Sequence, residues 1–367
     1  MMNQMTPIKK TLYFDYNATR PIRSSIKTLL AEMYDITGNA SSPHQQGLLM
    51  KRHVDHARQK TADILSIPSD RIIWTSGATE SNNTVVKGYT GPVIVSAIEH
   101  PSIYDARDNK IVCPVTVDGV VRLDVLEGLL KQHPHALVCI TAAGSETGVI
   151  QPLSKIIPLV HAYNGFIFSD CVQACGKIFV PYDKLDGFSL SGHKIGTPFG
   201  IGLLALKPEL KIEPLMVGGG QERFKRAGTT NVYGAVAFAQ ALEEALSEVW
   251  DDTAILRDYL DDELKKIHNT VMIVSKECKR LPNTTGFIVP NLSNMTQMMH
   301  YDIERCYVSL GTACASGTLK TADVLERMHL TKDFVHCFIR ISFGLDTTRE
   351  DVQLFLDSTK RLEINRS

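Results

Sequence analysis

The sequence has no surplus of either charge, no long apolar run and no Cys-x-x-Cys pair. Its 367 residues include 39 Lys and Arg against 40 Asp and Glu, a formal net charge of −1. This balance does not favour a nucleic-acid-binding or membrane surface. No apolar run approaches the roughly 20 residues of a membrane span, and residues 1–10 lack the apolar core of a signal peptide. We therefore expect a soluble, cytoplasmic protein without nucleic-acid or membrane partners.

The eight cysteines have no spacing that predicts a structural zinc site, and no metal ligand is assigned. Several lie inside apolar runs, as Cys139 does, and are expected to be small buried hydrophobic residues. Cys314 differs because its neighbours in Ser309-Leu-Gly-Thr-Ala-Cys-Ala-Ser-Gly317 are small. That composition predicts a loop, in which Cys314 is either a functional thiol or one more small hydrophobic residue.

Short apolar strands alternate with helical segments along much of the chain. This alternation predicts an α/β fold, with a large, mainly parallel sheet covered by helices on both faces and a smaller α/β C-terminal domain. We expect a large domain over 16–250 and a small domain formed by 1–15 and 251–367. Strands are expected at 71–75, 93–97, 136–142, 166–168, 188–190 and 200–206, and helices at about 46–65, 123–132, 153–163 and 232–267.

Lys194 lies in Ser191-Gly-His-Lys194, between two expected buried strands. A lysine there either extends its amine into water or serves as the Schiff-base lysine of an aldehyde cofactor such as pyridoxal phosphate. The small residues Ser191 and Gly192 leave space beside the amine. The tetrapeptide alone favours the solvated amine, because short motifs occur often by chance.

Other polar residues also follow the ends of expected strands, where ligands bind in parallel sheets. Ser76-Gly-Ala-Thr-Glu80 leads from a strand into a helix and is either an anion site or a helix cap. The basic, glycine-rich segment 218–230 is either a binding loop or a flexible solvated loop. The remaining strand-end candidates are Glu99-His100, Ser145-Glu146, and Asp170 with Gln173.

Taken in order, these segments resemble the NifS-like cysteine desulfurases, class V aminotransferases of the fold-type I pyridoxal-phosphate enzymes. The resemblance runs over nearly the whole chain, and the ordered set is far more specific than any one motif. The matched segments are Asp15-Tyr-Asn-Ala-Thr19, Gly38-Asn-Ala-Ser-Ser42 with His44, Thr75-Ser-Gly-Ala-Thr-Glu-Ser-Asn-Asn83, Glu99-His100, Glu146-Thr-Gly-Val-Ile-Gln-Pro152, Asp170-Cys-Val-Gln173, Ser191-Gly-His-Lys194, Gly218-Gly-Gly-Gln-Glu222, Arg226-Ala-Gly-Thr229, Gly311-Thr-Ala-Cys-Ala-Ser316 and Ile339-Arg-Ile-Ser342.

The resemblance implies a homodimer that converts L-cysteine to L-alanine with pyridoxal 5′-phosphate. Lys194 would carry the cofactor, Asp170 would pair with its pyridinium nitrogen, and Gln173 would donate to its phenolic oxygen. His100 would stack on the ring and handle protons. The residues implied for the phosphate are Ala78, Thr79, Ser191, His193 and, from the partner subunit, Thr229.

The resemblance also implies a route for the substrate and its sulfur. Arg340 and Asn17 would bind the substrate, with the planar guanidinium clamping the carboxylate. The Cys314 thiolate would take the sulfur as a persulfide and pass it to an acceptor protein, such as an iron–sulfur scaffold or a transfer-RNA thiolation partner. Each of these residues also has a simpler interpretation without a functional role. Asp170 would cap a helix, Gln173 would be a surface amide and His100 would be structural. The Arg340 stem would pack at a strand edge.

Three positions depart from the family pattern. Gly144-Ser145 stands in place of two asparagines, Arg20 in place of a threonine and Phe199 in place of a lysine. These changes are compatible with neutral drift, with a different substrate preference or with reduced activity. Two alternative functions therefore stay open: a selenocysteine lyase, and a weakly active cofactor-binding scaffold in a sulfur-transfer complex.

Overall fold

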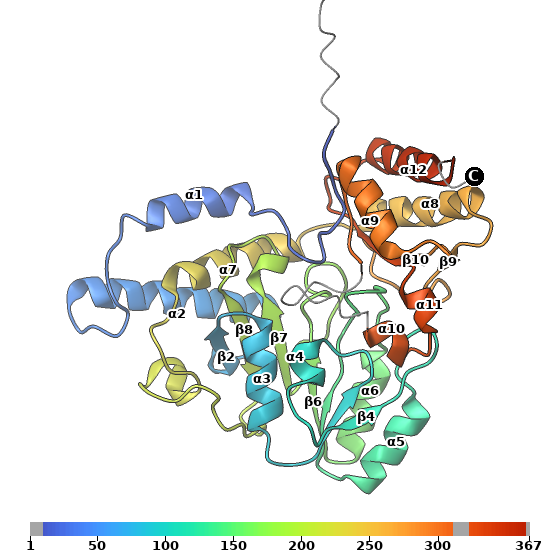
Figure 1. The fold of residues 1–367 in the computed structure, drawn as a ribbon. Coiled ribbons are helices and arrows are strands. Elements are labelled where there is room, and N and C mark those ends of the chain that lie inside the picture. Colours follow the sequence, from blue (N-terminus) through green and yellow to red (C-terminus); the bar gives the residue numbers. More distant parts are fainter. Residues whose placement is uncertain (1–9, 311–322, 365–367) are drawn as a thin grey trace, which may run out of the picture. The chain divides into compact units, whose positions relative to one another are not determined.

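The computed structural model describes residues 10–310 and 323–364. The chain divides into two compact units (Figure 1). Unit 1 comprises residues 1–18, 146–148 and 250–367, and unit 2 comprises residues 19–145 and 149–249. The sequence did not predict that 146–148 belongs with the terminal segments. The backbone of Leu281 donates a 2.7 Å hydrogen bond to the Gly148 carbonyl, which ties this short excursion to unit 1.

Unit 2 contains a seven-stranded sheet in the order β2-β8-β7-β6-β5-β3-β4. Strands β3 to β7 pair in parallel, whereas β8 runs antiparallel to both β7 and β2. The expected mainly parallel sheet is therefore confirmed, with β4 as an additional strand. The bounds are β2 Ile72–Thr75, β3 Val93–Ser96, β4 Ile111–Cys113, β5 Leu137–Cys139, β6 Phe166–Asp170, β7 Gly187–Ser191 and β8 Gly202–Leu206.

Helices cover both faces of this sheet. Ile73 of β2 joins an apolar cluster that includes Val85 and Ile103, while the next side chain, Trp74, packs edge-on against Phe238 at 5.4 Å. Successive strand side chains point to opposite faces, so both layers are needed to bury them. The helices of unit 2 are α1 Ser24–Met33, α2 Gln45–Leu65, α3 Ala78–Gly88, α4 Pro101–Tyr104, α5 Leu123–Gln132, α6 Leu153–Ala162 and α7 Val232–Leu246.

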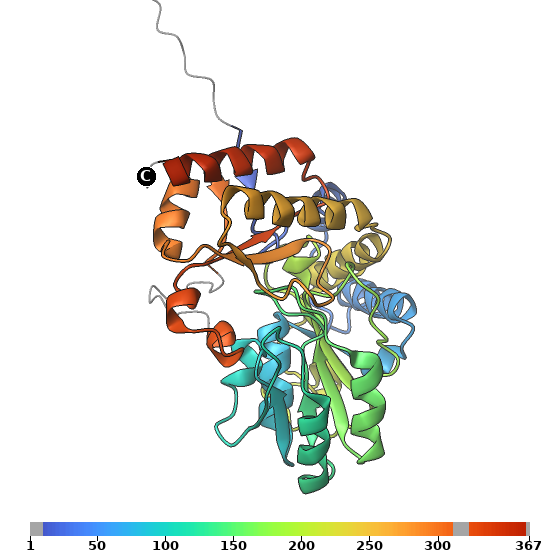
Figure 2. The same ribbon diagram turned by 90° about the vertical axis from the view of Figure 1, so that its right-hand side faces the viewer.

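Unit 1 is a smaller α/β unit. Its antiparallel sheet has the order β12-β10-β9, and β1 pairs in parallel with β11. Helices α8 and α12 lie side by side (Figure 2), and Phe14 packs edge-on against both Phe343 and Phe355 in the core. The elements are β1 Leu12–Tyr13, α8 Asp251–Ile267, β9 Met272–Ile273, β10 Thr284–Ile288, α9 Asn294–Ile303, β11 Cys306–Tyr307, α10 Asp323–Arg327, α11 Lys332–Val335, β12 Phe338–Ser342 and α12 Arg349–Ile364.

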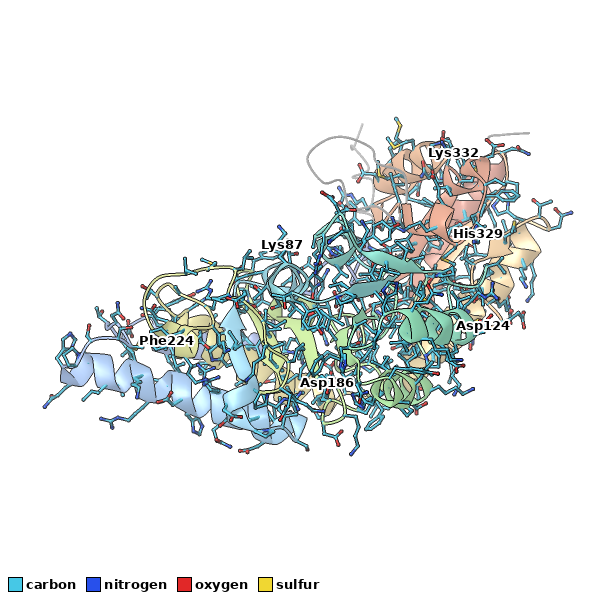
Figure 3. The ribbon with its side chains drawn as sticks, turned by 90° about the horizontal axis from the view of Figure 1, so that it is seen from below. Lys87, Asp124, Asp186, Phe224, His329 and Lys332 are labelled. Atoms are coloured by element: carbon cyan, nitrogen blue, oxygen red, sulfur yellow. The ribbon has the colours of Figure 1, made fainter. Side chains whose placement is uncertain are left out.

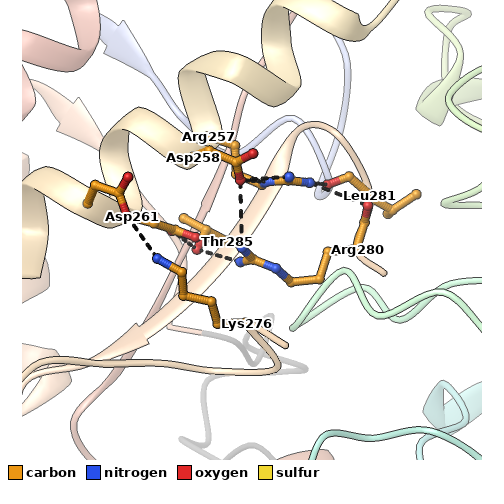
Figure 4. Close-up of polar contacts among 8 residues, drawn as sticks. Arg257, Asp258, Asp261, Lys276, Arg280, Leu281 and Thr285 are labelled. Carbon is orange, nitrogen blue, oxygen red and sulfur yellow. Dashed lines mark hydrogen bonds and ion pairs between the residues drawn. The ribbon is translucent and has the colours of Figure 1, made fainter. Parts of the chain in front are cut away.

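A buried ion pair links α8 to the sheet of unit 1 (Figure 4). Arg280 donates to Asp261 at 2.5 Å, and the hydroxyl of Thr285 donates to the other oxygen of the same carboxylate at 2.5 Å. Asp261 is fully buried and Arg280 is 8% exposed. Buried charges are tolerated when they are paired and hydrogen-bonded in this way.

Two expected elements are wrong in extent. The helix expected over 232–267 is two helices, because α7 ends at Leu246 and α8 begins at Asp251. The Ser247 hydroxyl donates to the Glu244 carbonyl at 2.8 Å and closes α7, and the Trp250 side chain is buried just before α8. The strand expected over 136–142 stops at Cys139, and the Thr141 backbone N–H donates to the Glu99 carboxylate instead.

Within residues 10–310 and 323–364, no helix is long and apolar enough to cross a membrane. In the same ranges, no three His, Cys, Asp or Glu side chains lie close enough together to hold a metal ion.

Candidate active site

The strand-end candidates of unit 2 meet at one edge of the sheet. β3, β5, β6 and β7 are parallel, and β2 shares their direction because both β2 and β7 run antiparallel to β8. Their carboxyl ends therefore lie on the same side, as in other open α/β sheets that bind ligands there. This edge brings together the segments 76–79, 99–100, 141–145, 170–173 and 191–194.

Asp170 is the last residue of β6, and the residue is 7% exposed. Asn82 donates to Oδ2 at 2.8 Å, and the Val172 backbone N–H donates to Oδ1 at 3.0 Å. The second contact is local, as expected if Asp170 only caps the following turn. The first comes from a distant helix, α3, and fixes the orientation of the buried carboxyl group at the end of β6.

Lys194 ends a 3-10 turn, Gly192–Lys194, directly after β7. Gly192 N donates to Ile201 O at 3.0 Å, and Thr197 N donates back to Gly192 O at 3.1 Å. A Cβ on Gly192 would clash with the Thr197 hydroxyl, so the turn has no room for a larger residue. Lys194 itself is half-buried rather than fully solvated. A rigid turn that presents a partly buried amine fits a Schiff-base lysine.

His193 is neutral at physiological pH. Burial, aided by the neighbouring Lys194 charge, lowers the pKa of His193 to about 4. Its Nδ1 lies 3.2 Å from the Thr19 hydroxyl. A bound phosphate would favour the imidazolium and raise this pKa again. Ser191, the other phosphate candidate of this turn, is buried.

The turn before α3 has the features of an anion site. The N-cap residue of this 11-residue helix is Gly77, which makes no side-chain hydrogen bond to the helix, and Ala78 is the first residue of the helix. A Cβ on Gly202 would lie 2.5 Å from the Cα of Gly77, so β8 packs tightly beneath the turn. Thr79 is exposed. Unshared N–H groups at a helix start attract anions.

Glu80 supplies part of the helix cap that the sequence left open. Its carboxylate accepts from Ser76 N at 2.7 Å and from Arg226 Nε at 2.8 Å. Burial alone would raise the pKa of Glu80, but the hydrogen bonds from Arg226 and Ser76 outweigh it and lower the pKa. The capping box is therefore incomplete, because Glu80 supplies its carboxylate but the N-cap residue Gly77 has no hydroxyl.

The glycine-rich segment is anchored rather than flexible. Arg58 and Glu222 form a buried bidentate pair with two contacts of 2.9 Å, and Trp74 N also donates to Glu222. Glu222, Arg223 and Phe224 all have left-handed backbones, with φ of 45°, 55° and 63°. Phe224 is 76% exposed and marks this segment in Figure 3. Thr229 lines a hollow that Ser76, Gly200 and Arg226 also border.

His100 and Gln173 differ in exposure. Gln173 is 6% exposed and its Oε1 accepts from Lys177 at 3.2 Å, so it is not the surface amide that the simpler reading required. His100 is exposed and caps α4, where its Nδ1 accepts from the Ser102 backbone N–H at 3.1 Å. An exposed ring after β3 can face a ligand at the strand ends.

The two substrate candidates belong to unit 1. Arg340, on β12, is 6% exposed and donates to Asp15 at 2.5 Å. Asn17 is 1% exposed; its amide donates to Thr284 at 2.9 Å and accepts from Asn283 at 3.3 Å. These contacts show Asn17 as a structural tie of unit 1, and its role toward a substrate stays a prediction.

Cys314 lies outside the described residues, but the start of its segment is placed. Ser309 pairs with Arg340 through two backbone hydrogen bonds of 3.1 and 2.8 Å. The described chain therefore lies beside the backbone of the predicted substrate clamp at Ser309, five residues before Cys314 in the sequence.

The departures from the family pattern have different structural settings. The Arg20 guanidinium forms a bidentate pair with Glu248 at 2.7 and 2.6 Å, and its backbone N–H donates to His193 O. Phe199 is 73% exposed, and its ring lies 5.2 Å from that of His193. Ser145 is half-buried in a hairpin closed by Gly144 N and Val149 O.

Sequence reasoning assigned no role to Asn82 and Ser102 at the unit 2 edge, nor to Asp15, the partner of Arg340 in unit 1. Asn82 is fully buried, and Ser102 is 7% exposed beside His100. Asn82 lies inside the matched segment 75–83, and Ser102 closely follows Glu99-His100. For Asn82 the available signal was a polar residue at a buried position of α3.

Comparisons with known proteins show the family to which the chain belongs. The aminotransferase class-V family matches residues 12–355. Cysteine desulfurase IscS of Dictyoglomus turgidum is 34% identical over 380 residues, covering 97% of this chain and 95% of that protein. A NifS-like protein from Rickettsia africae has a TM-score of 0.89 at 33% identity, covering 97% and 100%. A solved structure of SspA in complex with cysteine has a TM-score of 0.78 at 25% identity, covering 91% and 99%. The sequence resemblance is thereby confirmed, and the chain belongs to the aminotransferase class-V family of pyridoxal-phosphate enzymes as a NifS-like cysteine desulfurase.

Proposed function

We propose that this enzyme converts L-cysteine to L-alanine and leaves the sulfur as a persulfide on Cys314. The observation that carries the proposal is the convergence of Lys194, Asp170 and His100 at one edge of the unit 2 sheet. The similarity to proteins called cysteine desulfurases, at about one third identity over nearly the full length, supports the same activity.

The residues at this edge fit pyridoxal 5′-phosphate. Lys194 would hold it covalently, Asp170 would bind the ring nitrogen, and Ala78, Thr79, Ser191 and His193 would bind the phosphate. The free N–H groups at the start of α3 supply the donors that a phosphate needs. When bound, the cofactor supplies the electron sink that allows bonds beside the substrate amino group to break.

The chain's own residues would position the substrate and accept its sulfur. Arg340 would hold the carboxylate, because a guanidinium binds it through two parallel hydrogen bonds. The Cys314 thiolate would attack the substrate sulfur, so that a sulfur–sulfur bond forms while the carbon–sulfur bond breaks. The carbon then takes a proton and leaves as alanine. The carbon is reduced and the sulfur oxidised, so no external oxidant is needed.

We also propose a homodimer in which Thr229 completes the partner's phosphate site. Apolar residues exposed on and before the glycine-rich segment support a protein contact there: Leu215, Met216, Val217 and Phe224. The acceptor would be a protein such as an iron–sulfur scaffold, and the cytoplasmic location stays a prediction.

Alanine release from L-cysteine in the presence of a reductant tests the activity. We expect turnover in the wild type and none in Lys194→Ala. Release from L-selenocysteine alone would favour the lyase. No release from either substrate by a protein that binds the cofactor would favour the scaffold alternative, and Ser145→Asn would then be the first variant to assay.

A further inference from the structure

Asn82 connects Asp170 to the residues around His100. Its amide nitrogen donates to Asp170 Oδ2 at 2.8 Å and to Ser102 Oγ at 2.9 Å, and its oxygen accepts from the Ser189 hydroxyl at 2.7 Å. A carboxylate only accepts hydrogen bonds, so the nitrogen must face Asp170 and the amide orientation is fixed. Asn82 is fully buried, which keeps water from competing for these contacts.

Ser102 links Asn82 to the His100 imidazole through hydrogen bonds. Its oxygen accepts from Asn82, so its single hydrogen is available for His100 Nδ1, which lies 2.7 Å away. The backbone N–H of Ser102 also donates to Nδ1, at 3.1 Å. A backbone N–H has no accepting form, so Nδ1 must present its lone pair.

We propose that Ser102, held by Asn82, is a positioning residue that fixes His100 as the tautomer with its proton on Nε2. Nδ1 is occupied by two donors, and a proton there would face the Ser102 N–H. The neutral ring therefore offers an N–H donor to the strand-end site. A neutral histidine used as a donor is an established catalytic device. His100 would thus handle protons through Nε2, which would present its N–H to an acceptor atom at this edge.

This inference rests on the proposed role of His100 at the cofactor edge, but the proton position can be measured without catalysis. Nitrogen NMR of the cofactor-free protein, labelled at histidine, separates a protonated ring nitrogen from one with a lone pair. His100→Asn would assign the signals. We expect a lone-pair Nδ1 and a protonated Nε2 in the wild type, and a mixture of tautomers in Ser102→Ala.

The holoenzyme supplies the second readout. Loss of one hydrogen bond to the ring should lower kcat about tenfold in Ser102→Ala, with KM nearly unchanged, and Ser102→Thr should restore it. The matched control is Ser169→Ala, which removes a buried hydroxyl that donates to Ile140 O and not to this network. A wild-type Nδ1 that carries the proton overturns the proposal, as does an unchanged tautomer and kcat in Ser102→Ala. A protein with the expected tautomer that releases no alanine would refute the proposed function instead.

Discussion

Arg340 donates a 2.5 Å hydrogen bond to Asp15, so the predicted substrate clamp is already paired with a carboxylate of its own unit. Arg340 is 6% exposed, and a buried guanidinium needs such a partner. Asp15 occupies Nη2 as a substrate carboxylate would. The pair therefore holds the guanidinium in place within unit 1.

Replacing Arg340 with Lys should raise KM for L-cysteine about 30-fold, because an ammonium cannot form two parallel hydrogen bonds to a carboxylate. Steady-state alanine release would show this. Arg280→Lys is the control, since Arg280 is also buried and paired in unit 1, with Asp261. It should lower the free energy of unfolding without raising KM, and equal effects of both variants on KM would contradict the clamp.

Lys194→Ala should abolish the near-visible absorption of the covalently held cofactor, because no other amine is expected at that position. An absorption spectrum after reconstitution checks this. Lys207→Ala is the control: Lys207 follows β8 and pairs with Asp186 at 2.9 Å. It should keep the wild-type spectrum, and an unchanged spectrum in Lys194→Ala would refute the assignment.

The sequence predicted the edge of the sheet that carries the candidate site through the local pattern of its strands. Lys194 and Asp170 follow short apolar runs bounded by glycine or polar residues, and parallel strands bring such ends together. Asn82 could not be found in this way, because its partners are Asp170, Ser102 and Ser189, all distant along the chain. The same limit applies to Glu222, which looked solvated in sequence but is buried against Arg58, 164 residues away.

Glu222→Gln should lower the free energy of unfolding by about 3 kcal/mol, because it leaves the buried Arg58 charge without its carboxylate. Urea unfolding measures the change. Asp55→Asn is the control, because the Lys51–Asp55 pair is exposed and spaced 3.7 Å apart. Similar losses in both variants would mean that the Arg58 pair does not anchor the segment.

His193 should make stability depend on pH in the acid range. Its pKa is lowered to about 4 in the folded chain against about 6.5 when unfolded. Between these values the unfolded state binds more protons, so stability falls as pH decreases from about 6.5 to about 4. Urea unfolding of the cofactor-free protein at several pH values should show a shallower slope in His193→Asn. An identical slope would contradict a neutral, buried His193.

A dimer of two different variant subunits tests whether Thr229 acts in the site of its partner. If Thr229 acts in the partner's site, a dimer of Lys194→Ala with Thr229→Ala contains one site with both native residues. Co-expressed, doubly tagged heterodimers should then release alanine faster than either parent dimer. Rates no higher than those of the Thr229→Ala parent would place Thr229 in the site of its own chain, or outside the site.

Mass spectrometry of the protein after exposure to L-cysteine tests the central claim most directly. In the wild type we expect one added sulfur on the peptide that contains Cys314, together with free alanine. Cys314→Ser should gain no sulfur and lose turnover, because a hydroxyl does not replace a thiolate nucleophile, yet it should keep the cofactor absorption. Cys278→Ser, which alters a half-buried cysteine of unit 1, should behave as the wild type. Sulfur on Cys306 or Cys337, or no sulfur and no alanine at all, would contradict the account.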